Sequence, residues 1–421
     1  MVPHVVILGG GFGGLEAAKA LRGKEVRVTL VDRRNHHLFQ PLLYQVATAG
    51  LAATDIASPI RNILADQENC TVLLARATGI DTARNVLLLD DEANPELAYD
   101  ALILAVGVTN AYFGHDTWAE HAPGLKSLEE ALDIRRRVLL AYESAERTDD
   151  DDERRALLTF VVIGGGPTGV ELAGALSEIA RRTMMRNFRH FDPSDAKVHL
   201  LEGGPRLLPG FPEALSGQAK EDLEELGVEV SLQSPAKDID ATGVTLKDDR
   251  RIDARTVLWA AGVGGVPLVR TLGVPLARGD RVPVEDTLLV VGLKNVFAVG
   301  DMTSFKQDGE PLPGVAQVAM QGGKLAAKNA LRMLEGGTLK TFRYRDLGSM
   351  ATIGRSRAVA VLGRMNLTGV MAWFAWLFVH LMALVGFRNR LTVLLEWSWA
   401  YLTYERGARV ILEPARAISK D

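Results

Sequence analysis

Short apolar runs rich in β-branched residues recur along the chain, and segments with helical periodicity follow several of them. Runs of this length and composition are typical of strands that are buried on both faces. We predict strands at residues 5–8, 26–32, 101–106, 160–163, 198–202, 256–260 and 295–299, and helices at residues 15–21 and 170–179. Strands that alternate with helices form parallel sheets covered by helices. The hydrophobic pattern therefore predicts an α/β protein.

Two glycine-rich loops share the spacing Gly-x-Gly-x-x-Gly, and each lies between a predicted strand and a predicted helix. The first loop contains Gly9, Gly11, Phe12, Gly13 and Gly14, and the second contains Gly164, Gly166 and Gly169. In this pattern the first glycine makes a tight turn, the second lets a pyrophosphate approach, and the third lets helix and strand pack closely. Glycines that serve only turns would not require the same context twice. The chain is therefore predicted to bind two dinucleotides.

After each glycine loop, a second strand ends in an acidic residue and a later strand ends in a glycine. The second strand of each copy ends in an acid, Asp32 or Glu202, which can accept hydrogen bonds from ribose hydroxyls and would repel a 2′-phosphate. A later strand ends in small residues and a glycine, Gly107 or Gly262. Glu202 favours NADH, but Arg206 lies four residues further on and could contact a 2′-phosphate, so tolerance of NADPH stays open.

A third motif distinguishes the two sites. The strand at residues 295–299 leads into Gly300 and Asp301, where a carboxylate can bind the ribityl hydroxyls of FAD. Because this strand is predicted to complete the sheet of the first copy, we expect FAD at the Gly9 loop and the nicotinamide nucleotide at the Gly164 loop. A protein that holds both can pass a hydride from nicotinamide to flavin where the two domains meet.

The chain has 421 residues and a single cysteine, Cys70. Its length predicts two or three domains. One cysteine excludes a Cys-x-x-C relay within the chain, which removes the dithiol reductases and argues against sulfide oxidation. The first predicted strand begins close to the N-terminus and leaves no secretory signal, so a cytoplasmic protein is expected. We expect no metal site and no nucleic-acid partner.

Beyond Phe342 the composition changes. No Asp, Glu, Lys or Arg occurs between Arg364 and Arg388, and residues 343–421 carry 11 Lys/Arg against 5 Asp/Glu. Aromatic residues also gather in this region, at Trp373, Trp376, Trp397, Trp399, Tyr401 and Tyr404. Basic residues beside aromatic and aliphatic faces are typical of helices that lie in a membrane interface. A buried dimer helix and a true membrane span are the alternatives.

The acidic run at residues 148–155 is predicted to be a solvated connector between the two nucleotide domains. We therefore assign residues 1–150 to the first part of an FAD-binding domain and residues 151–268 to an inserted NADH-binding domain. Residues 269–342 then form the second part of the FAD-binding domain, and residues 343–421 form a region for membrane association and dimerisation.

Four stretches resemble the type II, single-subunit NADH:quinone oxidoreductases, which are similar to glutathione reductase in having two Rossmann-like domains. They are residues 39–48, 166–171, 316–322 and the aromatic tail at 401–409. The resemblance implies a membrane-bound enzyme that carries non-covalent FAD, and we expect it on the cytoplasmic face of the cell membrane. The apolar area of the tail favours a homodimer, and the oligomeric state stays open. The resemblance further implies that NADH is oxidised and a membrane quinone reduced, without proton pumping, in a respiratory chain.

The resemblance also implies roles for particular residues. Gln317 and Gln321 correspond to a pair that faces the quinone, and as i, i+4 neighbours on a helix they would share one face. Glu171 corresponds to an acid near the nicotinamide and the flavin, although a carboxylate in a first helical turn is also explained by the helix dipole. Thr48 and Ala316 are expected to contact the cofactor. An NADH-sensing flavoprotein and a soluble NAD(P)H-dependent electron-carrier reductase remain alternatives, and the type of quinone stays open.

Overall fold

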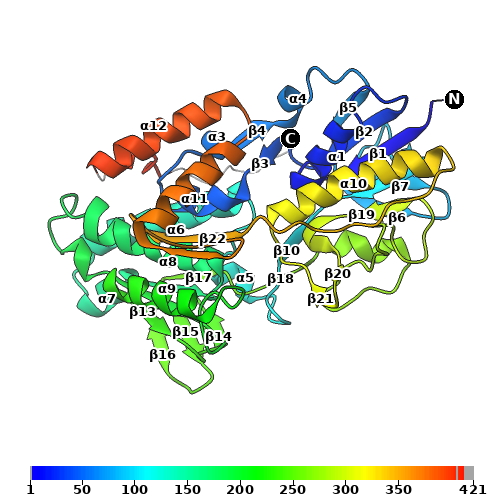
Figure 1. Ribbon diagram of the computed structural model, residues 1–421. Coiled ribbons are helices and arrows are strands. Elements are labelled where there is room, and N and C mark those ends of the chain that lie inside the picture. Colours follow the sequence, from blue (N-terminus) through cyan, green and yellow to red (C-terminus); the bar gives the residue numbers. More distant parts are fainter. Residues whose placement is uncertain (1, 404–405, 412–421) are drawn as a thin grey trace. The chain divides into compact units, whose positions relative to one another are not determined.

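The structure is a computed structural model that describes residues 2–403 and 406–411 (Figure 1). The chain forms two compact units, and each contains segments that are distant in sequence. Unit 1 comprises the chain up to Leu38, Ala57–Asn110 and Val263–Leu347, and unit 2 comprises Phe39–Ile56, Ala111–Gly262 and the described part of Gly348–Asp421. These divisions fall at other residues than the predicted domain boundaries. The assignment of functional domains stays a prediction, because compact packing does not identify a bound nucleotide.

Unit 1 is built on a parallel sheet of five strands in the order β19-β9-β1-β2-β5. The strands are β1 (His4–Leu8), β2 (Arg27–Asp32), β5 (Cys70–Leu74), β9 (Ala101–Leu104) and β19 (Val296–Ala298). In the register of this sheet, Val5 lies beside Val28 on one side and Ala101 on the other. β19 pairs with β9, which confirms that the strand predicted at residues 295–299 completes the sheet of the first copy.

Helices cover one face of this sheet and a small antiparallel sheet covers the other. Helices α1 (Phe12–Ala20) and α10 (Ala316–Leu334) lie side by side (Figure 1) and share a core with Val5 and Ile7. Strands β6 (Ala77–Asp81), β7 (Val86–Leu89) and β8 (Glu96–Ala98) pack against Val6 and Leu8 on the opposite face. Because neighbouring β1 side chains point to opposite faces, both faces need apolar residues, which explains the uninterrupted apolar run.

Unit 2 repeats this plan with a four-stranded parallel sheet in the order β13-β12-β11-β17. These strands are β11 (Thr159–Ile163), β12 (Lys197–Leu201), β13 (Val228–Ser231) and β17 (Thr256–Trp259), and α6 (Leu128–Arg147), α8 (Pro167–Glu178) and α9 (Glu213–Glu225) accompany them. An antiparallel sheet of β14 (Ala236–Asp240), β15 (Gly243–Leu246) and β16 (Arg251–Asp253) packs against Val161 and Ile163. The predicted double Rossmann-like architecture is thus confirmed.

The C-terminal region adds a sheet as well as two helices to unit 2. Strands β22 (Ser349–Gly354), β23 (Arg357–Leu362) and β24 (Met365–Thr368) are antiparallel and precede α11 (Gly369–Ala383) and α12 (Phe387–Thr403). The sheet packs directly on α8, because a Cβ atom at Gly174 would lie 1.7 Å from the carbonyl oxygen of Ile353. The sequence predicts only helices here, because the short strands with small residues give a weak periodic signal.

The acidic run at residues 148–155 corrects one prediction. It lies within unit 2 and forms helix α7 (Asp151–Leu157), whose N-cap Asp150 accepts hydrogen bonds from the N–H groups of Asp152 and Glu153. Its acidic residues are favourable in a first helical turn because of the helix dipole. The run is therefore a solvated, capped helix rather than a connector between the units.

Shorter elements complete the described chain. They are β3 (His36–Leu38), α2 (Leu43–Ala47), α3 (Ala53–Ile56), β4 (Ala57–Pro59), α4 (Ile60–Ile63), β10 (Val108–Asn110), α5 (Trp118–His121), β18 (Val263–Gly265), β20 (Lys306–Gln307) and β21 (Glu310–Pro311), with a π-helical turn at Ile179–Thr183 and 3-10 turns at Gln40–Leu42, Pro193–Asp195, Pro267–Leu272 and Gly300–Met302. In residues 2–403 and 406–411, no helix has both the length and the apolar character needed to cross a membrane.

Candidate functional site

The carboxyl edge of the parallel sheet in unit 1 gathers the residues predicted to bind the first dinucleotide. Gly9 follows β1, Asp32 ends β2, Gly107 follows β9 and Gly300 follows β19. Gly9 has φ +105°, and a Cβ at Gly14 would lie 1.8 Å from the carbonyl oxygen of Gly9, so both positions require glycine. In such sheets, ligands bind outside the carboxyl ends of the strands.

The loop leaves its helix N-terminus available to an anion. Gly11 is the N-cap of α1 and offers no side chain to the first-turn N–H groups, and a Cβ added there would meet nothing within 4 Å. The carboxylate of Asp32 accepts hydrogen bonds from the backbone N–H of Gly10 at 2.6 Å and of Arg34 at 2.7 Å. Phe12 and Gly13 are the first residues of α1, and the backbone of Gly13 packs against Gly323 of α10. This cradle fits the pyrophosphate and ribose of a dinucleotide.

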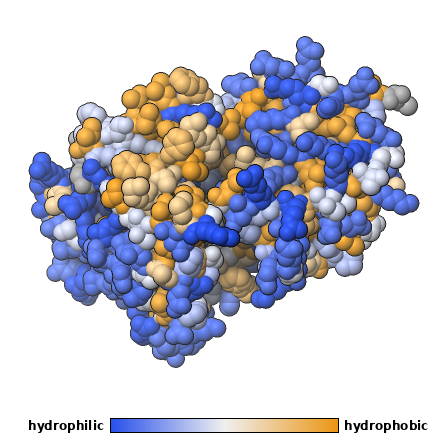
Figure 2. Space-filling view, in the orientation of Figure 1, coloured by the Kyte–Doolittle hydropathy of each residue, from blue (hydrophilic) through white to orange (hydrophobic). Residues whose placement is uncertain are grey.

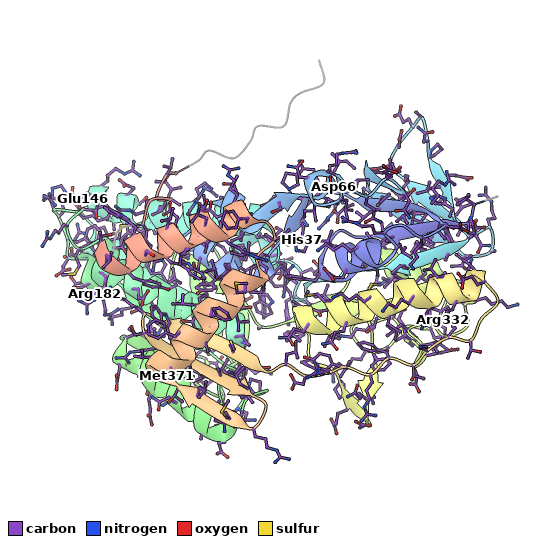
Figure 3. All side chains as sticks on the ribbon, turned by 45° about the horizontal axis from the view of Figure 1, so that its top comes forward. His37, Asp66, Glu146, Arg182, Arg332 and Met371 are labelled. Carbon is purple, nitrogen blue, oxygen red and sulfur yellow. The ribbon has the colours of Figure 1, made fainter. Side chains whose placement is uncertain are left out.

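His37, which is labelled in Figure 3, contacts the same loop. It is buried, its Nδ1 lies 3.0 Å from the carbonyl oxygen of Gly10, and its ring packs edge-on against Phe12 at 5.1 Å between centroids. Burial lowers the pKa of His37, which favours the neutral ring.

The parallel sheet of unit 2 has a carboxyl edge that is equivalent to that of unit 1. Gly164 follows β11, Glu202 follows β12 and Gly262 follows β17. Gly164 has φ +114°, and a Cβ at Gly169 would lie 1.8 Å from the carbonyl oxygen of Gly164. Gly166 is the N-cap of α8 and again provides no side-chain cap. The two glycine loops therefore meet the same steric requirement at the same positions.

Glu202 and Arg206 have different surroundings at the carboxyl edge of the unit 2 sheet. The Glu202 carboxylate accepts hydrogen bonds from the backbone N–H of Gly165 and of Gly204, both at 2.5 Å. The Arg206 guanidinium donates to the carbonyl oxygens of Phe211 at 2.8 Å and Pro209 at 2.7 Å. Arg206 is thus bound to its own loop, which leaves Glu202 as the charged group next to the glycine turn.

Asp301 and Ala316 lie near the third motif of unit 1. Gly300 has φ +75°, and Asp301 is half-buried in the 3-10 turn that follows β19. A Cβ at Gly314 would lie 3.4 Å from the Asp301 carboxylate, so the approach to this carboxylate from that side is narrow. Ala316 is the first residue of α10, whose N-cap Val315 provides no side-chain cap.

Gln317 and Gln321 share a face of α10, but their amides make different contacts. The Gln321 amide donates to the carbonyl oxygen of Arg345 at 2.9 Å and accepts from its N–H at 3.0 Å. Gln317 accepts a long hydrogen bond of 3.4 Å from the Tyr344 hydroxyl. Gln321 therefore holds the segment after α10 in place, whereas Gln317 retains most of its hydrogen-bonding capacity.

A cavity of about 70 Å³ inside unit 2 brings together two other predicted residues, Glu171 and Thr48. Glu171 lies on α8, where the backbone N–H of Thr352 and the indole of Trp376 interact with its carboxyl group. Burial raises the pKa of Glu171 to about 8, and these two donors offset only part of that effect. The side chain keeps some accessible surface because it faces the cavity. The surroundings of this carboxyl group therefore favour its protonated form.

The far part of this cavity contains an ion pair that the sequence did not reveal. Arg406 donates to the Glu178 carboxylate at 3.2 Å and to the carbonyl oxygen of Thr48 at 2.7 Å. The Thr48 hydroxyl donates to the carbonyl oxygen of Tyr44 at 2.8 Å. The Glu178 carboxylate also accepts from the backbone N–H of Arg355 at 2.6 Å. Thr48 therefore fixes backbone positions at this cavity.

A second polar chain connects α12 to α2. The indole N–H of Trp397 donates to the Gln45 side chain at 2.7 Å, and the Gln45 amide donates to the Tyr44 hydroxyl at 2.9 Å. Tyr44 and Gln45 belong to the stretch at residues 39–48 that carried the family resemblance. The family resemblance thus included these residues, but no sequence pattern predicted their hydrogen bonds.

The tryptophans of the C-terminal region correct another expectation. Trp373, Trp376 and Trp397 are buried, and Trp399 is exposed. Trp376 stacks on His380 at 4.3 Å, and Trp373 packs edge-on against Tyr401 at 4.8 Å. Most of these indoles form the interior of unit 2 rather than a surface belt. Tyr404 and Glu405, which the aromatic tail includes, lie outside the described residues.

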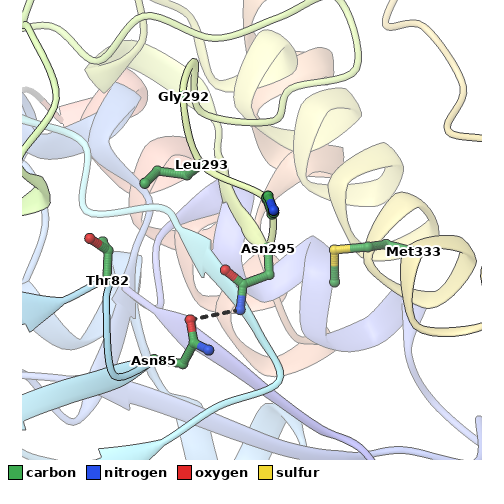
Figure 4. A pocket seen from close by; sticks show the side chains of 7 residues that line it. Thr82, Asn85, Gly292, Leu293, Asn295 and Met333 are labelled. Carbon is green, nitrogen blue, oxygen red and sulfur yellow. Dashed lines mark hydrogen bonds between the residues drawn. The ribbon is translucent and has the colours of Figure 1, made fainter.

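A larger depression in unit 1, of about 530 Å³, lies away from the glycine loops (Figure 4). It is lined by Thr82, Asn85, Gly292, Leu293, Lys294, Asn295 and Met333. The Asn295 amide donates to the Asn85 side chain at 3.0 Å. Because Asn295 precedes β19, the depression lies at the amino edge of the sheet, opposite the edge that binds ligands in this fold.

The comparisons with known proteins agree with this geometry. Residues 3–323 match the family described as Pyridine nucleotide-disulphide oxidoreductase, and residues 347–404 match the NDH2 C-terminal domain. The chain is 44% identical, over 97% of its length, to the Type II NADH:quinone oxidoreductase Ndh of Mycobacterium tuberculosis, of which it covers 90%. It is 43% identical, over 97% of its length, to NdhA of the same organism, of which it covers 89%.

The chain belongs to the type II NADH:quinone oxidoreductases. Membership confirms the resemblance that the sequence motifs indicated. The solved structure of NDH2 from Plasmodium falciparum in complex with NADH has the same fold, with a TM-score of 0.88 at 20% identity, and the match covers 98% of this chain and 100% of that chain. The three-stranded sheet and two helices after residue 347 are the part of the chain that matches the C-terminal domain of this family.

Proposed function

We propose that this chain oxidises NADH and reduces a membrane quinone by two electrons, without pumping protons. The observation that carries the proposal is the pair of equivalent glycine-loop edges in a chain that belongs to the type II NADH:quinone oxidoreductases. FAD is typical of this family, and the cradle around Gly9 and Asp32 fits its pyrophosphate and ribose. When bound there, FAD would accept a hydride from NADH and pass two electrons to the quinone.

The two edges receive different nucleotides in this proposal. FAD occupies the edge of unit 1, because Asp301 follows a strand of the same sheet and can bind the ribityl hydroxyls. NADH occupies the edge of unit 2, where Glu202 can accept hydrogen bonds from the ribose hydroxyls. The contacts of Arg206 with its own loop support NADH over NADPH, because this guanidinium is already paired with carbonyl oxygens.

We propose that Gln317 acts on the quinone and that Glu171 acts near the nicotinamide or helps to move a proton to the reduced flavin. An amide donor can stabilise the negative charge that develops on a quinone oxygen during reduction. Gln317 suits this role better than Gln321, whose amide is engaged by the Arg345 backbone. A protonated Glu171 can serve as a general acid, since a carboxyl group with a pKa of about 8 can hold and release a proton near neutral pH.

The apolar helix surface of unit 2 supports attachment to a membrane. We define this surface as the exposed apolar side chains Val370, Met371, Phe374, Phe378, Val379 and Met382 of α11 and Phe387, Leu391, Leu394, Leu395, Trp399 and Leu402 of α12. Figure 2 shows apolar residues gathered over these two helices, and Met371 is labelled on α11 in Figure 3. Exposed patches of this kind mark interaction surfaces. We propose that this surface lies in the cytoplasmic face of the cell membrane, and that the enzyme is a homodimer.

The proposed function is tested with FAD-loaded protein under anaerobic conditions. NADH should bleach the flavin absorbance, and a quinone should then restore it rapidly over many turnovers. The proposal fails if the protein oxidises NADH but a quinone does not accelerate the reaction. Bleaching followed by slow recovery with quinone would instead indicate an NADH sensor.

A further inference from the structure

Two phenol groups line the cavity of unit 2, Tyr44 from α2 and Tyr401 from α12. Tyr44 is 7% exposed, and its oxygen accepts a hydrogen bond from the Gln45 amide at 2.9 Å. The oxygen of Tyr401 accepts a hydrogen bond from the indole N–H of Trp373. A phenol can donate one hydrogen bond in addition to those that it accepts. Both tyrosines therefore still have a hydrogen to donate.

Neither hydroxyl hydrogen has an acceptor among residues 2–403 and 406–411. Tyr44 interacts electrostatically with Tyr401, and both interact with Glu178, so the two hydroxyl groups lie in the same part of the cavity. Burial raises the pKa of both phenols, so each keeps its hydrogen. A donor that is removed from water and lacks an acceptor is unfavourable. The contents of the cavity must therefore accept these two hydrogen bonds.

The charged groups of the lining favour an anion as the acceptor. Two guanidinium groups line the cavity, Arg355 and Arg406, and the guanidinium carbon of Arg355 lies 5.8 Å from the centroid of the Tyr401 ring. Of the two carboxyl groups, Glu178 is paired with Arg406, and the surroundings of Glu171 favour its neutral form. The lining thus carries more positive than negative charge near neutral pH. Attraction between charges is stronger away from bulk water, so an anion is held better here than a neutral acceptor.

We propose that this cavity binds a monatomic inorganic anion of the size of chloride, which accepts hydrogen bonds from the Tyr44 and Tyr401 hydroxyl groups. A cavity of about 70 Å³ has room for such an ion and some water, because one water molecule needs about 10–15 Å³ of this space. Trp373 and Trp397 also line the cavity and leave little room for an organic anion. The Glu178 side chain is 22% exposed, so an ion can enter from solvent at this end.

Thermal unfolding in different sodium salts tests the inference, because an ion that binds only the folded chain raises its Tm by mass action. The full-length, FAD-loaded protein is unfolded in sodium chloride, bromide and gluconate at equal ionic strength. Gluconate is too large for the cavity, so we expect a Tm that is higher by about 2 °C or more in the two halides. Tyr44→Phe and Tyr401→Phe each remove one O–H donor, and each should reduce this halide effect by at least half. Tyr142→Phe is the matched control, since Tyr142 is a buried tyrosine of unit 2 whose hydroxyl also has no partner but which does not line the cavity.

Anomalous scattering from bromide in crystals of the protein gives a second measurement. We expect a bromide peak in the cavity within hydrogen-bond distance of both hydroxyl groups, and no such peak in the double variant Tyr44→Phe and Tyr401→Phe. The inference is overturned if the cavity holds only water in crystals grown with bromide, or if the halide effect on Tm is as large in Tyr44→Phe and Tyr401→Phe as in Tyr142→Phe. Neither measurement uses NADH or a quinone, so a failure of the proposed function would leave both results unchanged.

Discussion

Replacing Glu171 with glutamine should stabilise the folded protein, and by an amount that grows with pH. The carboxyl group lies in the cavity of unit 2, and burial raises its pKa from 4.5 to about 8. The folded chain therefore favours the neutral acid over the carboxylate. Glutamine has nearly the same shape and cannot ionise, so Glu171→Gln removes the cost of keeping an ionisable group at this position.

The direction of the pH dependence follows from proton counts. Between pH 4.5 and about 8 the unfolded chain has released the Glu171 proton while the folded chain still holds it, so the free energy of unfolding falls as the pH rises. Below this window both states are protonated, and above it both are ionised. At about 1.4 kcal/mol per pKa unit, the destabilisation reaches roughly 3 kcal/mol at pH 7.

Thermal unfolding followed by circular dichroism at pH 5, 6, 7, 8 and 9 measures this effect. The difference in Tm between Glu171→Gln and the unmodified protein should widen from pH 5 to pH 8 and then level off. For a domain of this size, each kcal/mol corresponds to roughly 2–4 °C, so the difference at pH 7 should reach several degrees. Glu221→Gln, which removes an exposed carboxyl group on α9, should show no such trend. A Tm difference that does not vary with pH would refute the reasoning, since it would mean that Glu171 ionises in the folded chain as it does in the unfolded chain.

Three further predictions concern the nucleotide edges and the apolar helix surface. Gly14→Ala should abolish retention of FAD during purification, whereas Gly169→Ala should leave FAD bound but raise the KM for NADH at least tenfold. The reason is the same in both variants, because each added Cβ would lie 1.8 Å from a carbonyl oxygen. Loss of flavin in Gly169→Ala alone would show that the two nucleotides are exchanged. Glu202→Ala should raise the KM for NADH about tenfold and narrow the preference over NADPH, which steady-state kinetics with both nucleotides measures; an unchanged ratio would count against the ribose contact. The double variant Phe374→Asp and Phe378→Asp, at positions 58% and 67% exposed, should reduce flotation with anionic vesicles while sparing activity with a short-chain quinone, and equal loss of both would point to a structural role.

The sequence determined the parts of this protein that depend on local geometry. A tight turn between a strand and a helix requires glycine at Gly9 and Gly14, and a buried strand requires an apolar run such as that of β1. Each requirement involves only a few consecutive residues, so the two parallel sheets and the glycine loops at their carboxyl edges could be predicted. Family membership could be predicted for the same reason, because its motifs are contiguous.

Only the tertiary structure decided which polar groups meet inside unit 2. Glu178 and Arg406 are separated by 228 positions, and Gln45 and Trp397 are separated by 352. No sequence pattern could reveal pairs that lie so far apart in the chain. The indoles that suggested a surface belt proved to be mostly interior, because a helix with apolar residues on all sides does not indicate which face its neighbours cover. The pKa of Glu171 was likewise beyond the sequence, since it depends on how much water the surrounding elements exclude. Chain order thus specified the two glycine loops and the sheets that carry them, and long-range packing specified which polar groups share the cavity of unit 2.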